Sequence, residues 1–338
     1  MSQRNEALAE KLRKRQLYLL RHQVSFRNEI SAFLRTLEKG IAAEIITISP
    51  SEPAREAYRR QRVDKLLQAV STLISKTYRD IGKHATRELQ GLAEVESFFL
   101  LQSVNELMGT NLRNIALDAP AALALVKDTM MSGAVLQDWL DEQSSWIKDR
   151  FAQEMRMGIV GGESDAEMVG RIRGTSELNY TDGLMEMSRR KAKILVRGAS
   201  SAVVRETRTK SVLDNPDVFS GIQQVSVLDG RTSHTCISYA GKVWVLPGYK
   251  PIGHNLPYNG GTPRHPNCRS TEIPVIAGEP AADDIGFDDF IKDKPDAELN
   301  ELLGRGRAEL YRDQKITLSG LVDQAGRPLT LKQLREIV

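Results

Sequence analysis

Residues 221–245 read GIQQVSVLDGRTSHTCISYAGKVWV, and in this stretch the helical spacing of apolar residues gives way to alternation. Two valines alternate ahead of an Asp-Gly turn, and a second short apolar run follows at 243–245. Residues 271–276 form a third such run. Alternating, β-branched residues bounded by turn residues are typical of strands. The sequence therefore predicts a small β-rich module over residues 221–276.

Upstream of this module, apolar residues recur at intervals of three and four, which is the spacing of amphipathic helices. Ser51 and Asp118 are expected to begin two of these helices, because their side-chain oxygens can accept hydrogen bonds from the first free amides. A proline two residues further on suits the first turn in both cases. The predicted helices cover residues 8–41, 52–81, 84–110, 119–131, 133–157 and 181–211.

Length and pattern together predict more than one structural unit. A chain of 338 residues with 41% hydrophobic content is long enough to bury a core. We expect a mainly α protein with a small β-rich module, which is an α+β fold. The predicted divisions are a helical N-terminal unit (1–150), a helical lead-in (151–220), a β-hairpin module with a Cys/His cluster (221–276), and a linker with a helical tail (277–338).

Charge and hydropathy argue against several classes of protein. Lysine and arginine total 47 against 44 acidic residues, so the net charge of +3 gives no reason to expect wholesale coating of nucleic acid. No apolar run approaches the roughly 18–20 residues of a membrane span, and the first residues lack the apolar block of a secretory signal. We therefore expect a protein that is made in the cytoplasm and does not enter a membrane.

Both cysteines and three of the five histidines lie within residues 234–268. The turn from His265 to Cys268 can direct an imidazole and a thiolate at one point, and Cys236, across a predicted hairpin, supplies a third ligand. Structural zinc sites use such sulfur and nitrogen ligands in a tetrahedron. The candidate ligands are Cys236, His265, Cys268 and His234, with His254 or Asp229 as alternatives for the fourth position.

Two interpretations without a metal remain open for this cluster. The cysteines can be small buried hydrophobes, while His265 is a hydrogen-bonded residue that holds the loop. A disulfide between Cys236 and Cys268 is the other alternative, although two cysteines in 338 residues are typical of a reducing compartment. The residues alone do not choose between zinc, packing and a disulfide.

Motifs of common enzyme classes are absent from the sequence. There is no G-x-x-x-x-G-K-[ST] phosphate loop, no G-x-G-x-x-G between a strand and a helix, and no G-x-S-x-G nucleophile elbow. His234, His254 and His265 suggest one catalytic alternative, a metal-dependent nuclease similar to the HNH type, in which a histidine activates water. Their spacing does not reproduce such a motif, so we predict that the protein is not an enzyme.

Three ordered segments carry a resemblance to a known family. Residues 228–236 (LDGRTSHTC), 240–244 (AGKVW) and 263–270 (PRHPNCRS) resemble the signature of the Mu F-like phage head morphogenesis, or minor capsid, proteins. The likeness covers roughly residues 150–338, as a C-terminal Mu F-like domain. Some members have further cysteines where this chain has Ser233 and Ser270, which bears on whether a metal site is complete.

The resemblance implies a minor virion protein of a tailed phage that is encoded beside the portal protein and carried inside the prohead. Such proteins associate with the portal or the capsid interior and aid assembly or genome delivery. The implied partners are therefore the portal protein and the major capsid or scaffolding protein, with genomic DNA and further copies of the chain as additional candidates. The implied location is the virion interior, after assembly in the host cytoplasm, and no catalytic activity is implied.

The polar residues of the signature are expected to staple the module. Asp229 should start a tight turn, and arginines such as Arg231 and Arg269 can hold carboxylates or carbonyl oxygens in a forked geometry. Alternatively, these arginines face the portal or DNA. The predicted structural motif comprises Asp229, Arg231, Thr232, Pro266, Asn267 and Arg269.

A second functional hypothesis is a DNA-binding ejection protein. The N-terminal helix carries basic residues from Arg13 to Arg35, and arginines and lysines also surround the apolar stripe of residues 189–210. These faces could grip phosphates, whereas ordinary solvation of a helical surface is the alternative.

Overall fold

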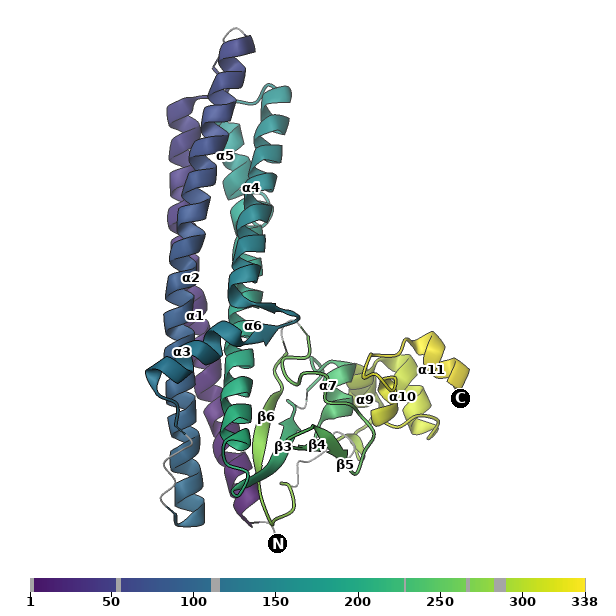
Figure 1. The fold of residues 1–338 in the computed structure, drawn as a ribbon. Coiled ribbons are helices and arrows are strands. Elements are labelled where there is room, and N and C mark those ends of the chain that lie inside the picture. Colours follow the sequence, from purple (N-terminus) through teal and green to yellow (C-terminus); the bar gives the residue numbers. More distant parts are fainter. Residues whose placement is uncertain are drawn as a thin grey trace. The chain divides into compact units, whose positions relative to one another are not determined.

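The computed structural model describes residues 3–52, 56–110, 116–227, 229–265, 268–282 and 290–337. Within these residues the protein is mainly helical and carries a small antiparallel sheet, which confirms the predicted α+β class (Figure 1). The helices are α1 (Gln3–Ile48), α2 (Glu56–Met108), α3 (Ala119–Asp128), α4 (Leu136–Val160), α5 (Asp165–Arg173), α6 (Leu184–Leu213), α7 (His234–Tyr239), α9 (Asp296–Leu303), α10 (Arg305–Arg312), η1 (Ser319–Leu321) and α11 (Leu331–Ile337). The strands are β1 (Met130–Met131), β2 (Ala134–Val135), β3 (Phe219–Val225), β4 (Val243–Val245), β5 (Lys250–Ile252) and β6 (Thr271–Ile276).

The protein divides into two compact units, each built from segments that are distant in the sequence. The sheet unit comprises Met1–Leu19, Gln90–Ser132 and Ser200–Val338, and the helical unit comprises Leu20–Leu89 and Gly133–Ala199. Helices α1, α2 and α6 each contribute residues to both units. The units therefore do not coincide with the consecutive segments expected from the sequence.

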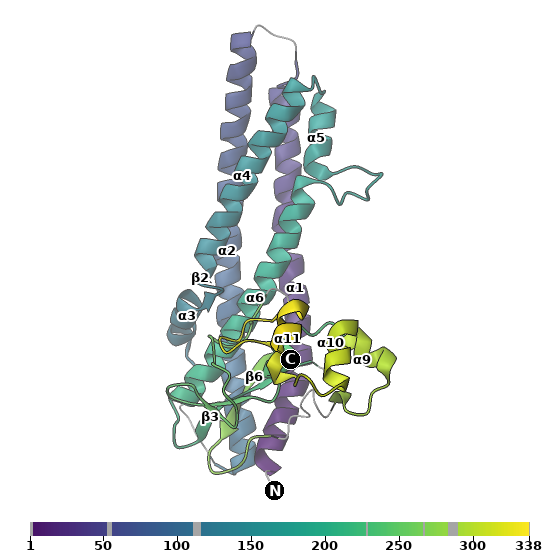
Figure 2. The same cartoon turned by 90° about the vertical axis from the view of Figure 1, so that its right-hand side faces the viewer.

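The helical unit contains α5 and long stretches of α1, α2, α4 and α6, which run side by side (Figures 1 and 2). Their apolar stripes meet in one core, as the three-and-four spacing predicts. Gly40 of α1 faces Leu73 of α2, where an added Cβ would lie 2.6 Å from the leucine Cδ2. The missing side chain allows the two helices to approach closely.

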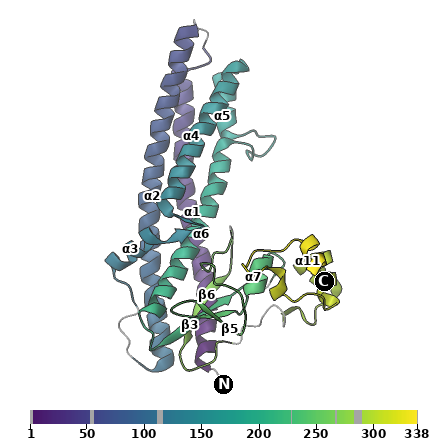
Figure 3. The same cartoon turned by 45° about the vertical axis from the view of Figure 1, so that its right-hand side comes forward.

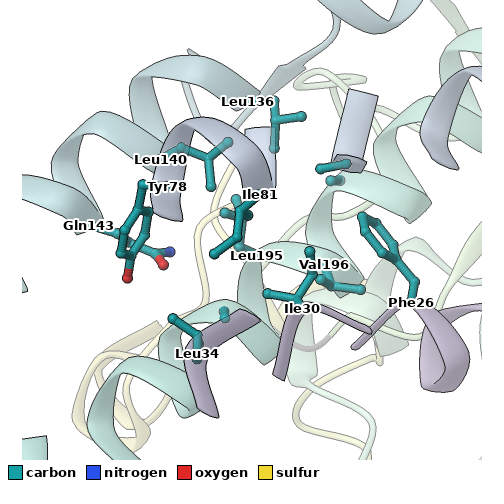
Figure 4. Close-up of a pocket in the computed structure, with 13 residues that line it drawn as sticks. Phe26, Ile30, Leu34, Tyr78, Ile81, Leu136, Leu140, Gln143, Leu195 and Val196 are labelled. Atoms are coloured by element: carbon teal, nitrogen blue, oxygen red, sulfur yellow. The ribbon is translucent and has the colours of Figure 1, made fainter. Parts of the chain in front are cut away.

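A small cavity lies in the core of the helical unit (Figure 4). Its volume is ≈ 20 Å³, which is room for about one water molecule. Because its walls are almost wholly apolar, we assign it to imperfect packing and not to ligand binding. It is lined by Phe26, Ile30, Leu34, Tyr78, Ile81, Ala85, Leu136, Leu140, Gln143, Ala192, Leu195, Val196 and Ala199.

Helix α2 corrects the prediction of two separate helices. One continuous helix, Glu56–Met108, runs through most of both predicted stretches, 52–81 and 84–110. Gly82 lies between them and is tolerated inside the helix, because glycine costs only about 1 kcal/mol relative to alanine there. The burial of Ile81 and Ala85 on either side of it anchors the helix in the core.

Of the two predicted helix caps, one is confirmed. Asp118 caps α3, where its Oδ1 accepts a hydrogen bond from the backbone amide of Ala121 (2.8 Å). Ser51 does not cap α2, because that helix begins at Glu56 and the Ser51 amide donates instead to Asp165 Oδ1 (3.1 Å). The proline expected in the first turn of α2 lies outside the described residues.

Two predictions made from the helical pattern are wrong. Residues 130–135 contain the strands β1 and β2, where helices were expected up to 131 and from 133. Helix α5 was not predicted, although Ser164 and Glu167 carry a capping-box sequence. The Ser164 hydroxyl accepts from the Glu167 amide (3.3 Å), and a Glu167 oxygen accepts from the Ser164 amide (2.7 Å).

The sheet unit contains a four-stranded antiparallel sheet in the order β5-β4-β3-β6 (Figure 3). Strands β4 and β6 match the runs predicted from the sequence, and β3 begins two residues before the expected start. Strand β5 was not predicted from the sequence. Because β3 is central, Ile222 pairs with Trp244 on one side and with Pro274 on the other.

The connection from β3 to β4 is not the simple hairpin that the Asp-Gly pair suggested. Asp229 and Gly230 lead instead into the short helix α7. Ser233 caps this helix, since its hydroxyl accepts from the Cys236 amide (3.2 Å). Cys236 therefore lies on a helix and not on a strand.

Trp244 belongs to the buried core of the sheet unit and is 0% exposed. Its ring stacks on Tyr239 with centroids 5.8 Å apart, and its Nε1 donates to the Leu256 carbonyl (3.0 Å). Other buried members of this core include Leu8, Leu12, Leu100, Val104, Phe219, Ile222 and Ile273.

A second core joins α7 to the C-terminal helices α9, α10 and α11, which lie close together in Figure 3. Ile237 of α7 and Leu299 of α9 are among its buried members. The C-terminal region is thus helical, as predicted. Among the described residues, every helix is too short or too polar to cross a bilayer.

Candidate metal centre

Three of the four predicted ligands meet beside the start of α7. Cys236 Sγ lies 3.2 Å from His265 Nε2 and 3.6 Å from Cys268 Sγ. All three ligand atoms lie within 4.8 Å of one another. Helix α7 supplies the first sulfur, and the loop leading into β6 supplies the imidazole and the second sulfur. We call these three residues the thiol cluster.

The separations in the thiol cluster fit a tetrahedral zinc ion. Bonds of about 2.3 Å to sulfur and about 2.0–2.1 Å to nitrogen place two sulfurs about 3.8 Å apart, and a sulfur and a nitrogen about 3.5 Å apart. The observed 3.6 and 3.2 Å are only slightly shorter. Small side-chain movements would therefore let an ion enter.

The two interpretations without a metal fare differently. Both cysteines are free, so the disulfide is not formed in this structure. Each cysteine is 2% exposed, which also satisfies the packing alternative. His265 Nε2 lies 2.8 Å from Ser233 Oγ, so the imidazole has a hydrogen-bonding partner without a metal. Metal binding is favoured by the convergence of two sulfurs and a nitrogen.

Ionisation of the thiol cluster also suits a cation. The hydrogen bond from the Cys236 thiol, together with His265, lowers the pKa of Cys268. The same sulfur–sulfur contact, with burial, raises the pKa of Cys236. The cluster thus offers one thiolate directly, and a bound cation would deprotonate the second thiol, as coordinating thiols are.

His234, the fourth predicted ligand, does not join the thiol cluster. Its Nε2 lies 3.3 Å from the Leu303 carbonyl oxygen, and burial lowers its pKa. In a strand, two residues that are two positions apart would share a face. In a helix, two residues correspond to a turn of about 200°, so His234 and Cys236 point to opposite sides of α7.

The alternatives for the fourth position are also engaged elsewhere. His254 Nε2 lies 2.9 Å from the Val243 carbonyl oxygen, and its Nδ1 accepts from the Leu256 amide (3.1 Å). Burial lowers the pKa of His254. The three histidines of the nuclease hypothesis therefore have separate partners within the sheet unit.

Two serines border the thiol cluster where some Mu F-like proteins are expected to carry cysteines. Ser233 Oγ contacts His265 Nε2, and the Ser270 side chain hydrogen bonds to Cys236. Ser270 Oγ also donates to Ser226 Oγ (3.0 Å). A metal held here would have three strong protein ligands, with a serine oxygen or water in the fourth position.

Asp229 and Arg269 brace the thiol cluster from the outside. Arg269 Nη1 donates to Asp229 Oδ2 (2.7 Å), and its Nη2 donates to Oδ1, which makes a forked ion pair. The arginine lowers the pKa of Asp229 to about 2. Because Arg269 follows Cys268 directly, this pair fixes the loop that carries two of the three ligands.

The other predicted motif residues have mixed outcomes. Asp229 starts a tight turn, as expected, because its Oδ1 accepts from the Arg231 amide (2.9 Å) and its carbonyl accepts from the Thr232 amide (3.0 Å). The Thr232 hydroxyl donates to the Val227 carbonyl. The Arg231 side chain is exposed. The predictions for Pro266 and Asn267 fall outside the described residues.

A buried carboxylate that the sequence analysis missed organises the neighbouring loop. Glu272 in β6 is 1% exposed, and its oxygens accept from the Thr262 amide (2.6 Å) and the Tyr258 hydroxyl (2.7 Å). Burial raises the pKa of Glu272. Arg264, whose guanidinium lies 3.6 Å from the centroid of the Tyr239 ring, fastens the same loop. The sequence signal for Glu272 was a single acidic residue in a predicted strand that is otherwise mostly apolar.

Part of the predicted basic faces is engaged within the protein, while Arg13, Lys14, Arg21 and Arg35 are exposed. Arg208 is 1% exposed and donates to Glu96 Oε1 through Nη2 (2.6 Å) and Nε (3.0 Å). Arg15 donates to the other oxygen of Glu96 (3.1 Å), and Arg189 donates to Glu38 (2.9 Å). Both the solvated-face and the DNA-contact interpretations are therefore wrong for Arg208.

Comparisons with known proteins identify no relative. No protein-family model matches the chain, and neither a curated protein nor a solved structure matches it.

Proposed function

We propose that this chain is a minor virion protein of the Mu F-like head morphogenesis family, which acts by binding and not by catalysis. One observation carries the proposal. The three segments of the sequence resemblance contribute to one structural assembly, although Asp229 and Arg269 are 40 residues apart. Residues 228–236 and 263–270 together provide the ion pair and the thiol cluster, and residues 240–244 provide the core tryptophan.

The thiol cluster has a structural role in this proposal. Cys236, His265 and Cys268 would hold a zinc ion that ties α7 to the loop before β6. Zinc would add a stronger cross-link to the Ser233–His265 hydrogen bond and the Asp229–Arg269 ion pair, which already join these segments. The support is the fit of the sulfur and nitrogen separations to a tetrahedron.

The proposed partners are the portal protein and the major capsid or scaffolding protein, and the proposed location is the interior of the phage head. The test uses the phage or prophage whose genome carries the coding sequence. Mass spectrometry of purified particles should detect the chain, and removal of its gene should lower the yield of infectious particles. Particles that lack the chain and assemble normally without it would overturn the proposal.

A DNA-binding role is the second candidate, and a groove in the helical unit favours it. The groove between α2 and α4 has a volume of ≈ 850 Å³. Its charged lining residues are four basic and one acidic, and serine and threonine hydroxyls lie among them. Such a surface suits phosphate groups. The charged lining residues are Arg79, Lys83, Arg87, Lys148 and Asp141.

Salt dependence and charge reversal test the DNA candidate. If the groove binds phosphates, the logarithm of affinity should fall with the logarithm of salt concentration by about 0.9 for each contact. Lys83→Glu should weaken binding, whereas Lys127→Glu, at an exposed position on α3 outside the groove, should change it little. No DNA binding at low salt, or equal effects of both substitutions, would remove this candidate.

A further inference from the structure

A second group of metal-binding side chains lies in the helical unit, between α1 and α2. The ligand atoms of Glu29, His84 and Glu88 lie within 4.8 Å of one another. His84 Nε2 is 2.8 Å from Glu29 Oε2, and His22 Nε2 is 3.8 Å from Glu88 Oε2. We propose that Glu29, His84 and Glu88 form a binding site for a divalent transition-metal ion that links α1 to α2, with His22 beside Glu88 at its edge.

Helix geometry explains how these side chains come together between α1 and α2. His84 and Glu88 are one turn apart on α2 and share a face. His22 and Glu29 are seven residues apart on α1, which is about two turns and again one face. His22, the earlier residue on α1, contacts Glu88, the later residue on α2, and Glu29 contacts His84. The two helices therefore run antiparallel here. The four residues thus form two adjacent rungs across one helix pair.

The donor set selects the class of ion. Imidazole nitrogen with carboxylate oxygen suits zinc and neighbouring first-row metals, whereas calcium and magnesium prefer oxygen ligands alone. The side chains of His22 and His84 are 16% and 23% exposed, and those of Glu88 and Glu29 are 37% and 39% exposed. An ion can therefore enter from solvent and still be partly enclosed.

Neighbouring side chains hold the ligands in position. The Ser25 hydroxyl donates to Glu29 Oε1 (3.0 Å), which leaves the other oxygen directed at His84. The Phe26 ring lies 6.2 Å from each of the two imidazoles, and the Phe33 ring lies 5.6 Å from that of His84. Supports of this kind orient metal ligands and raise affinity.

Two simple ion pairs are the alternative, and the geometry favours a metal over them. Glu88 lies within reach of both His84 and Glu29, so two carboxylates share one small space. Like charges at such a distance repel one another, and a divalent cation between them removes the repulsion. The arrangement is independent of the thiol cluster, which contains sulfur and lies in the other unit.

Cobalt is a suitable probe, because it replaces zinc and reports its ligands by absorption. The full-length protein is titrated with Co²⁺, alongside Glu29→Gln and Glu88→Gln variants whose folding is checked by circular dichroism. We expect each substitution to lower cobalt affinity at this site at least about tenfold, since even loss of an outer support costs that much. Any sulfur-to-cobalt charge-transfer absorption should stay unchanged, because it would come from the thiol cluster.

Asp64→Asn is the matched control. Asp64 is an exposed carboxylate on the same helix, about 36 Å from Glu88 along the axis, so its loss should leave cobalt binding unchanged. If the wild type, Glu29→Gln and Glu88→Gln proteins bind the same number of cobalt ions with the same affinity, the residues form ion pairs only and the proposal is overturned. Zn²⁺ should likewise raise the melting temperature of the wild type more than that of Glu88→Gln.

Discussion

The interior of the helical unit and the interior of the sheet unit are stabilised by different kinds of contact. In the helical unit, apolar stripes of α1, α2, α4 and α6 meet around a small apolar cavity. In the sheet unit, charged groups are buried as well, including Glu96 (0% exposed), Arg208 (1%) and Glu272 (1%). Apolar cores tolerate changes that conserve volume, whereas a buried ion pair depends on both partners. Single polar substitutions should therefore damage the sheet unit most.

The largest effect is expected from Glu96→Ala. This change leaves Arg208 buried without its carboxylate partner, which should lower the stability of the sheet unit by about 3–5 kcal/mol. Urea unfolding would be followed by Trp244 fluorescence in a protein whose Trp139 and Trp146 are replaced by phenylalanine. Those two tryptophans lie in the helical unit, so their removal makes the signal specific.

The control for this substitution removes both charges. A Glu96→Leu/Arg208→Met variant removes both fully buried charges and leaves only Arg15, whose side chain is 11% exposed, without its contact to Glu96. It should therefore be clearly more stable than Glu96→Ala. If the double variant is as unstable as the single one, then shape and not charge pairing holds this region. A buried ion pair would then no longer distinguish how the sheet unit is stabilised from how the helical unit is stabilised.

A somewhat smaller effect is expected from Leu34→Ala in the helical unit. Leu34 is 1% exposed and lines the apolar cavity, so the truncation enlarges that cavity and should cost about 2–5 kcal/mol. Leu34→Met conserves volume and should cost less than about 1.5 kcal/mol. The measurement is the urea midpoint by circular dichroism at the helix band. Equal midpoints for the two variants would show that packing at this position is loose.

The smallest effect concerns the exposed side of the thiol cluster. The pKa of Asp229 is lowered to about 2 by Arg269, below the unfolded value of about 3.9. The pair therefore stabilises the folded protein fully above about pH 4, and this contribution is lost as the pH falls towards 2. Because the Asp229 side chain is 41% exposed, we expect at most about 1 kcal/mol.

Arg269→Gln tests that expectation. The variant should be slightly less stable at pH 6, and the difference from the wild type should shrink between about pH 4 and pH 2, as the carboxylate is protonated. Unfolding midpoints at several pH values give the comparison. A difference that stays constant over this range would mean that Arg269 acts by packing and not through Asp229.

The same contrast between units explains what the sequence could predict. Periodic apolar residues predicted most helices and three of the four strands of the sheet, because the spacing of apolar residues shows which face of an element is buried. His234 was misplaced because the pattern did not show that its segment is helical, and a change from strand to helix reverses which neighbours share a side. Glu96 and Arg208 form an ion pair although they are 112 residues apart in the sequence. No local sequence pattern indicates that these two residues meet.

We propose that the segments resembling the Mu F-like signature form one module in which the thiol cluster binds a metal. The most direct measurement is the absorption spectrum of the full-length protein saturated with Co²⁺, compared with that of a Cys268→Ser variant. We expect sulfur-to-cobalt charge-transfer absorption in the wild-type protein, and we expect the Cys268→Ser variant to lose it. Its absence from the wild type, or its persistence in the variant, would contradict the claim and leave the two cysteines as packing residues.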